Sequence, residues 1–287
     1  MISQDLQKRI RHLEITTRKQ ISGPLLGEAQ SALKGSGFEF NQLREYSEGD
    51  DIRFIDWKAS ARGDKMLVRQ YLEDRNRTIY LVVDVSASTE YGSQEITKSE
   101  LMKQLAGVLA FVSLHKKDSL GLILFSDTIE KVIPPRQSRS HTISVVNTIF
   151  SYKAQRKTTA LSAPIEYLAR LKGQKAIVCL ISDFMAPLDK KLISLGSRKH
   201  DFLAFRCLDP RELSFPDVGT LRIEDSETGV QSTVAGSGAS ALNQALVTWQ
   251  ERQKELLISA KIDLLDLRVG GTFSGELVKF LRQRVYG

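Results

Sequence analysis

A run of five apolar residues, 79–83, leads directly into Asp84. These residues are mostly β-branched or aromatic, which predicts a strand buried on both faces, as central strands of a parallel sheet are. Ser86 and Ser88 follow Asp84 at every second position, so a loop leaving the strand can turn one carboxylate and two hydroxyls toward one point. Such oxygen ligands suit Mg²⁺, Mn²⁺ or Ca²⁺. Asp and Ser are also common turn residues, so the motif needs companions.

Two further segments supply those companions. Residues 176–181 form a second apolar run, which ends in Ser182 and Asp183, and residues 157–161 carry Thr158 and Thr159 at the start of a helical pattern. Loops at the carboxyl ends of neighbouring parallel strands meet where an open sheet binds its ligands. We therefore expect these loops to converge on one ion.

The alternation of strands with helices predicts the fold class. Apolar runs predict strands at 120–125, 202–208 and 262–267, and helical spacing predicts helices at 97–115, 140–152, 161–171, 188–195, 240–257 and 274–284. Residues 219–223 and 229–234 read as a hairpin. This order is typical of an α/β protein with a doubly wound, mostly parallel sheet. We assign residues 77–287 to this domain, and residues 1–76 to an N-terminal extension of helix and short strands.

The extension has two parts. Residues 4–19 carry Leu6, Ile10, Leu13 and Thr17 at helical spacing, which predicts an amphipathic helix. Residues 37–62 mix charges with aromatics and predict short strands, a turn and one helical turn. In that helical turn, Ile52, Ile55 and Trp57 are expected to pack inward, and Asp50 or Asp51 to act as its cap.

The chain contains no apolar run long enough to span a membrane, and residues 1–20 lack the apolar core of a signal peptide. Its two cysteines, Cys179 and Cys207, lie within apolar strand patterns, as buried and reduced thiols do. We therefore expect a cytoplasmic protein without disulfides or zinc.

The net charge of +7 permits either an acidic protein or a nucleic acid as partner. Residues 131–165 contain no Asp or Glu, and Arg156 and Lys157 directly precede the Thr158–Thr159 pair. Two interpretations stay open. The stretch is either a solvated basic face, or a positive rim beside the ion that attracts an acidic partner.

The segment from Gly37 to Arg62 is also a family signature. It contains Gly-x-Glu-Phe, Arg-Glu-Tyr, Gly-Asp-Asp-Ile-Arg and Ile-Asp-Trp-Lys-Ala-Ser-Ala-Arg in that order. This order closely resembles the domain of unknown function 58 family, and the match continues through residues 67–73 into the Asp84 strand. The resemblance implies an N-terminal block joined to a von Willebrand factor A-like domain. It further implies a role beside MoxR-type AAA+ ATPases, as an adaptor in chaperone-like assembly or maturation of protein complexes.

The candidate ligands resemble the metal-ion-dependent adhesion site of von Willebrand factor A domains. The set comprises Asp84, Ser86, Ser88, Thr159 and Asp183. The resemblance implies that the first four lie near the ion, preferably Mg²⁺, and that Asp183 acts largely through water. Thr158 lies beside Thr159, so either hydroxyl can be the one that faces the ion.

The sequence lacks the Gly-x-Ser-x-Gly elbow, the Walker phosphate loop and the dinucleotide-binding Gly-x-Gly-x-x-Gly motif. We therefore expect a non-enzymatic interaction module, in which a partner's Glu or Asp completes the coordination of the ion. One alternative is a metal-dependent hydrolase with Asp183 as the general base. A second is a nucleic-acid-binding protein using residues 131–157, although this stretch offers few aromatics for stacking.

Overall fold

The computed structural model describes residues 8, 10–15, 39–47, 50, 55–61, 65–72, 77–215 and 220–286. The chain forms two compact units, one of Met1–Ala32 with Arg77–Gly287 and one of Leu33–Asn76. The helical residues 10–15 thus count with the larger unit, whereas we had grouped them with the extension. Ile10 is buried there, and Leu13 fills the space that a Cβ at Gly107 would take. Leu6 and Thr17 of the predicted helix lie outside the described residues.

The larger unit is built on a six-stranded sheet with the order β10-β7-β6-β3-β4-β5. Neighbouring strands are parallel except β4 and β5, which are antiparallel. The strands are β3 (Thr78–Asp84), β4 (Ser119–Phe125), β5 (Ile129–Arg136), β6 (Ile177–Ser182), β7 (Asp201–Leu208) and β10 (Asp263–Arg268). The predicted fold class, a doubly wound and mostly parallel sheet, is confirmed.

The chain enters this sheet in the middle and builds outward in both directions. It proceeds from β3 through β4 to β5 on one side, then crosses to β6 and continues through β7 to β10 on the other. The order of these strands therefore reverses between β3 and β6. In open α/β sheets, ligands bind at this switch point, outside the carboxyl ends of the strands.

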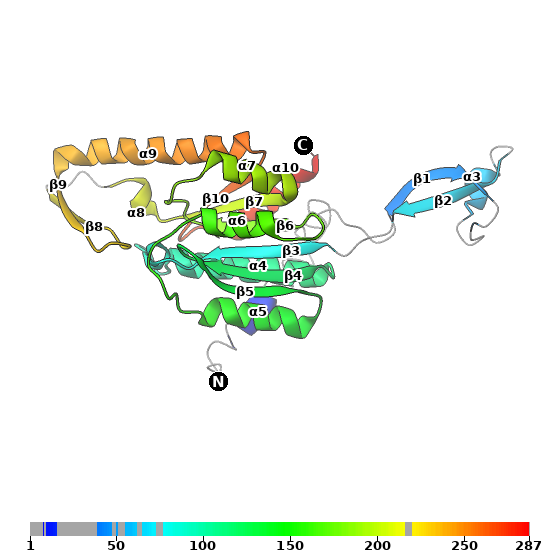
Figure 1. Cartoon of the computed structure of the whole chain (residues 1–287), viewed down its shortest axis with the longest axis horizontal. Helices are drawn as coiled ribbons and strands as arrows, with labels where there is room; N and C mark the ends of the chain where they lie inside the picture. The colour runs from blue at the N-terminus through cyan, green and yellow to red at the C-terminus, as the bar shows by residue number, and fades with distance from the viewer. Residues whose placement is uncertain are drawn as a thin grey trace. The chain divides into compact units, whose positions relative to one another are not determined.

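Helices cover both faces of the sheet (Figure 1). On one face, Tyr80 and Val82 of β3 pack in a core with α6 (Ser162–Arg170), α7 (Lys190–Lys199) and the end of α9 (Gly236–Ser259). Side chains alternate along a strand, so Leu81 and Val83 point to the other face. That face is covered by α4 (Lys98–His115), α5 (Arg139–Ser151) and α10 (Phe273–Tyr286).

Local signals set the beginnings of several helices. Thr97 accepts a hydrogen bond of 3.2 Å from the backbone N–H of Glu100 and so caps α4, at the start of the helix predicted from residue 97. The predicted helix at 188–195 instead spans α7, because Asp189 caps it through the N–H of Leu192 and so delays its start.

Between β7 and α9 the chain forms the short helix α8 (Pro210–Leu213) and the hairpin of β8 (Thr220–Glu224) and β9 (Gln231–Ala235). The hairpin was predicted at nearly these residues. It forms a two-stranded sheet of its own, separate from the six-stranded one.

The smaller unit contains the antiparallel pair β1 (Glu39–Glu45) and β2 (Leu67–Leu72) and the turn of helix α3 (Trp57–Ser60). The cap of α3 is Asp56, which accepts hydrogen bonds from the N–H groups of Lys58 and Ala59. The prediction of Asp50 as the cap is wrong, because Asp50 accepts from the N–H of Ser47 and closes the preceding turn.

The expected inward packing in this helical turn holds only in part. Ile55 is 6% exposed, but Trp57 is 64% exposed, so the prediction that Trp57 packs inward is wrong. The first position after the Asp56 cap points the indole outward, while Ile55 precedes the cap and bridges to Val68. Asp51 and Ile52 lie outside the described residues.

Two remaining expectations concern the environment of the protein. Both cysteines are buried and neither forms a disulfide, as predicted. Within the part of the chain that the structure describes, no helix combines the length and the apolar character needed to cross a membrane.

Candidate functional site

The site lies at the switch point between β3 and β6. Asp84 is the last residue of β3, and Ser182 is the last residue of β6, the strand paired with it. The apolar runs of these strands lie in the core, so each strand emerges from it at its first polar residues. The side chains of Asp84 and Ser182 consequently meet at the same edge of the sheet.

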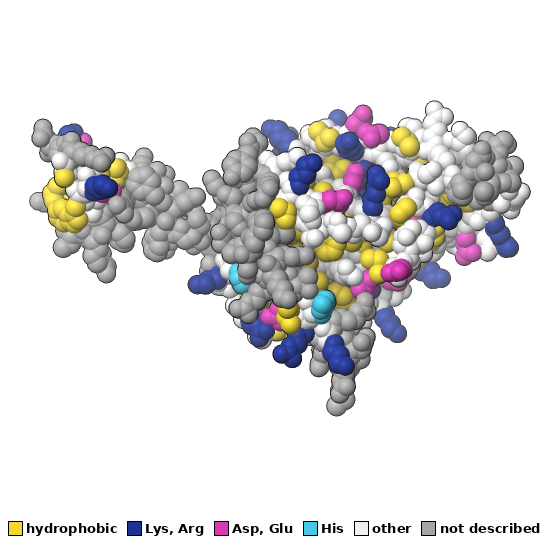
Figure 2. Space-filling view, turned by 180° about the vertical axis from the view of Figure 1, so that it is seen from behind, with side chains coloured by type: hydrophobic (Ala, Val, Ile, Leu, Met, Phe, Trp, Pro, Cys, Tyr) yellow, Lys and Arg dark blue, Asp and Glu magenta, His cyan; other side chains and the backbone are white. Residues whose placement is uncertain are grey.

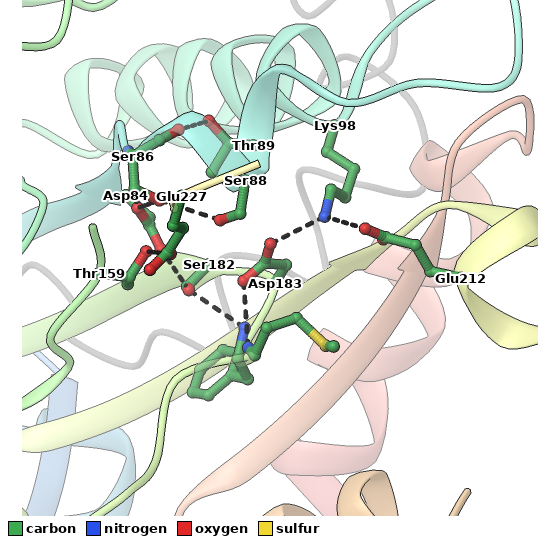
Figure 3. Close-up of polar contacts among 12 residues, drawn as sticks. Asp84, Ser86, Ser88, Thr89, Lys98, Thr159, Ser182, Asp183, Glu212 and Glu227 are labelled. Carbon is green, nitrogen blue, oxygen red and sulfur yellow. Dashed lines mark hydrogen bonds and ion pairs between the residues drawn. The ribbon is translucent and has the colours of Figure 1, made fainter. Parts of the chain in front are cut away.

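Asp84 is 2% exposed and accepts three hydrogen bonds (Figure 3). One oxygen accepts from the backbone N–H of Ser86 at 3.0 Å and from its hydroxyl at 2.7 Å. The other accepts from the hydroxyl of Ser182 at 2.6 Å. Ser182 belongs to the Ser-Asp pair seen in the sequence, but its contact with Asp84 was not foreseen.

The loop after Asp84 folds back over the strand end. The 3₁₀ turn η3 (Ala87–Glu90) brings the hydroxyl of Ser88 to 3.1 Å from that of Ser86, and Thr89 fixes the turn by donating to the Ser86 carbonyl at 2.7 Å. The structure thus brings Asp84, Ser86 and Ser88 together, as the spacing of the motif predicts.

The Thr158–Thr159 loop lies against this first loop. The N–H of Ala87 donates to the carbonyl of Lys157, and the N–H of Ala160 donates to the carbonyl of Ser126, both at 2.9 Å. Thr158 donates to Asp127 at 3.0 Å, whereas Thr159 donates to Glu227 at 2.7 Å. The two neighbouring hydroxyls therefore point to different partners.

Ser88 and Thr159 line the same cavity, which has a volume of about 710 Å³. Residues of the β8–β9 hairpin, including Glu227, line it as well. Thr158 is absent from the lining. Of the two threonines, Thr159 is thus the one that lines the same cavity as the loop after Asp84.

Asp183 has a partner that the sequence analysis missed. Lys98 lies 2.8 Å from Asp183 and 2.7 Å from Glu212, and its side chain is fully buried. The other oxygen of Asp183 accepts from the N–H of Met185 at 3.1 Å. One sequence signal could have pointed to Lys98: it is the first residue of a helix, where the helix dipole disfavours a cation unless acids lie nearby.

The electrostatics of the site are dominated by buried carboxylates. Burial, followed by the negative charge of Asp183, raises the pKa of Asp84 to about 7, although its hydrogen bonds from Ser182 and Ser86 act in the opposite direction. Lys98 neutralises Asp183, but the groups that donate to Asp84 are neutral hydroxyls and an amide. A bound cation would place a positive charge beside the Asp84 carboxylate.

The donor set fits a hard divalent cation. Carboxylate and hydroxyl oxygens are the ligands that Mg²⁺ and Mn²⁺ take. A site with few protein carboxylates keeps coordination positions for water. Among the described residues, no group of three or more His, Cys, Asp or Glu side chains is arranged to hold a metal. A cation here would therefore depend on the serine and threonine hydroxyls as well as on Asp84.

The basic stretch is partly paired with acids. Arg156 lies 3.3 Å from Asp127, and Arg139 lies 2.6 Å from Glu14. On the face drawn in Figure 2, Lys and Arg side chains are spread over the surface, with Asp and Glu between some of them. Neither observation favours one continuous basic patch on that face.

Comparison with known proteins gives a family and several relatives. A model of the family described as "Protein of unknown function DUF58" matches residues 42–255. The uncharacterized proteins Rv1480 of Mycobacterium tuberculosis and Mb1516 of Mycobacterium bovis are each 28% identical over 288 residues, covering 98% of this chain and 90% of the relative.

Solved structures with a similar course of the chain include the conserved hypothetical protein BatB from Bacteroides thetaiotaomicron, with a TM-score of 0.48 and 14% identity over 74% of this chain and 100% of that one. The SpRpn10 VWA domain has a TM-score of 0.38 and 9% identity over 71% of this chain and 94% of that one.

Proposed function

We propose that this chain, which belongs to the DUF58 family of proteins of unknown function, is a non-enzymatic protein-interaction module that binds an acidic residue of its partner through a divalent cation. The residues that would hold the cation are Asp84, Ser86, Ser88 and Thr159, with Asp183 acting through water. Mg²⁺ is the preferred ion, and Mn²⁺ and Ca²⁺ are the alternatives.

One observation carries this proposal. Ser88 and Thr159 come from two loops far apart in the sequence, yet both line one cavity at the switch point of the sheet. A cation held by these loops would face that cavity, where a partner's side chain can reach it. Ligand sites of open α/β sheets lie at this same place.

The charges of the site support the choice of an acidic partner. Lys98 already neutralises Asp183, which leaves Asp84 as the carboxylate available to the cation. A divalent cation beside one carboxylate keeps a net positive charge. When bound, it supplies an electrophilic centre for a Glu or Asp of the partner.

The pairing of Asp183 also bears on the hydrolase alternative. Asp183 was the candidate general base, and both of its oxygens are engaged, one by Lys98 and one by the N–H of Met185. These two contacts tie the carboxylate to Lys98 and to the backbone after β6, so it serves as a structural partner in the fold. We therefore prefer the binding function to the catalytic one.

We further propose that the partner is a MoxR-type AAA+ ATPase, and that the chain serves it as an adaptor in the assembly or maturation of protein complexes. This part rests on the family resemblance. A nucleic-acid-binding role is less well supported, because Arg139 and Arg156 of the basic stretch are paired with acids.

Titration of Mg²⁺ and Mn²⁺ into the wild-type chain and into Asp84→Ala, followed by calorimetry, tests the cation site. We expect one ion per wild-type chain and none for the variant. Asp127→Ala is the matched control, because Asp127 contacts Thr158 instead of the proposed ligands. We expect this variant to bind the ion as the wild type does. Equal binding by Asp84→Ala and the wild type would contradict the proposal.

Capture of a co-expressed MoxR-type ATPase tests the partner. The ATPase itself uses Mg²⁺ with its nucleotide, so chelation alone cannot separate the two proteins. Capture is therefore compared between the wild type, Asp84→Ala and Asp127→Ala at constant Mg²⁺. We expect Asp84→Ala alone to lose the ATPase, and equal capture by all three would refute cation-dependent binding.

A further inference from the structure

The tip of the β8–β9 hairpin is a well-defined turn. Asp225 accepts hydrogen bonds from the N–H groups of Glu227 and Thr228 at 2.8 and 3.2 Å, and its own N–H donates to the carbonyl of Val230. Gly229 has a φ of +71°, a conformation that glycine adopts without strain. These features hold Glu227 at the tip between the two strands.

Glu227 reaches from this tip to the candidate cation site (Figure 3). Its Oε1 accepts the hydrogen bond of 2.7 Å from Thr159, across 68 residues of sequence. Thr159 is one of the proposed cation ligands. Glu227 therefore places a carboxylate next to that ligand, where a carboxylate from a partner is expected.

The hairpin tip lines the cavity beside the candidate cation site. Arg222, Glu224 and Glu227 line the cavity of about 710 Å³ together with Ser88 and Thr159. The side chains of Arg222 and Glu224 are exposed, and they bond to Gln231 within the hairpin. The Thr159–Glu227 contact is a single hydrogen bond, and segments held by few contacts open most readily.

We propose that Glu227 is a built-in carboxylate ligand of the cation site, which occupies the place of the partner's acidic residue until the partner displaces the β8–β9 hairpin. This inference rests on the proposed function. An internal ligand acts at a high effective concentration, of about millimolar order for a short connection, so a weak or free carboxylate would not compete with it. A partner must add contacts in the cavity to displace it.

The test uses Mn²⁺ alone as the probe, with Glu227→Gln as the main variant. Glutamine keeps the length of the side chain and an oxygen that can accept from Thr159, but removes the charged ligand. Glu224→Gln is the matched control, because it removes the same charge from the same hairpin, at a residue that bonds to Gln231 instead of Thr159.

Two readouts are measured, the Mn²⁺ dissociation constant and the hydrogen exchange of residues 220–235. We expect Glu227→Gln to bind Mn²⁺ about tenfold more weakly, while Glu224→Gln binds it like the wild type. We also expect Mn²⁺ to slow exchange of the hairpin in the wild type and in Glu224→Gln, but not in Glu227→Gln.

The outcomes separate this inference from the function on which it rests. If Asp84→Ala loses Mn²⁺ while Glu227→Gln matches the wild type in both readouts, the internal ligand is overturned and the cation site stands. If the wild-type chain binds no Mn²⁺, both are overturned.

Discussion

The ammonium group of Lys98 lies 2.8 Å from Oδ2 of Asp183, and neither side chain is more than 1% exposed. Burial by itself lowers the pKa of Lys98, but the charges and hydrogen bonds of Asp183 and Glu212 outweigh this effect and raise it. Lys98 therefore stays charged in the interior. It links α4 to α8 through Glu212, whereas the hydrogen bonds that Asp84 accepts from Ser86 and Ser182 come from neutral groups.

Replacing Lys98 by Met should destabilise the fold strongly. The substitution leaves Asp183 and Glu212 without their cation, and breaking a buried ion pair in this way costs about 3–5 kcal/mol. Urea unfolding followed by circular dichroism measures the loss. Lys103→Met is the control. Lys103 lies on the same helix, but its ion pair with Glu90 is longer, at 3.9 Å, and Glu90 is exposed. Equal stability of the two variants would show that the buried pair has no structural role.

Replacing Thr159 and Thr158 separately by Val should identify the hydroxyl that faces the ion. Thr159→Val removes a proposed ligand and the bond to Glu227, so we expect Mn²⁺ to bind about tenfold more weakly and the hairpin to exchange faster. Thr158→Val removes only the bond to Asp127 and should leave both readouts unchanged. The reverse pattern would assign the ion to Thr158.

Without a cation, the contribution of Asp84 to stability should fall as the pH rises. Between its ordinary pKa of 3.8 and its folded value of about 7, the folded protein holds a proton that the unfolded chain has lost. The free energy of unfolding therefore decreases with pH across this window. In chelator, Asp84→Asn should gain stability relative to the wild type from pH 4 to pH 7, by roughly 1–4 kcal/mol. A difference that does not change with pH would argue against a raised pKa.

Arg206 should stabilise the pairing of the edge strand β10 with β7. Its guanidinium donates to both oxygens of Asp266, at 2.7 and 2.8 Å, and to the carbonyl of Gln250 in α9. Because Asp266 is 42% exposed, we expect Arg206→Met to cost about 2 kcal/mol, less than a fully buried pair. Arg170→Met, which breaks an exposed pair, should cost less than about 0.5 kcal/mol in the same unfolding experiment.

The elements that carry the site could be predicted because their signals are local. The apolar run before Asp84 and the run before Asp183 each predict a strand buried on both faces, and both strands are found. Polar residues directly after such runs must lie where the strands leave the core. The convergence of Asp84, Ser86 and Ser88 follows from the same local geometry.

Local patterns do not specify which distant side chains meet. Trp57 was expected to pack inward with Ile52 and Ile55, but it directly follows the cap at Asp56 and is 64% exposed. Thr158 and Thr159 are equivalent by sequence, and only the packing of their loop assigns one to Asp127 and the other to Glu227.

The sequence by itself determined the doubly wound fold class and the polar loops that follow its buried strands, because the alternation of strands and helices along the chain follows from short-range periodicity. Only the tertiary structure decided the partners of these loops. Lys98 meets Asp183 across 85 residues, and Thr159 meets Glu227 across 68. Such pairs depend on how helices and hairpins dock onto the finished sheet, and therefore on packing that no single segment encodes.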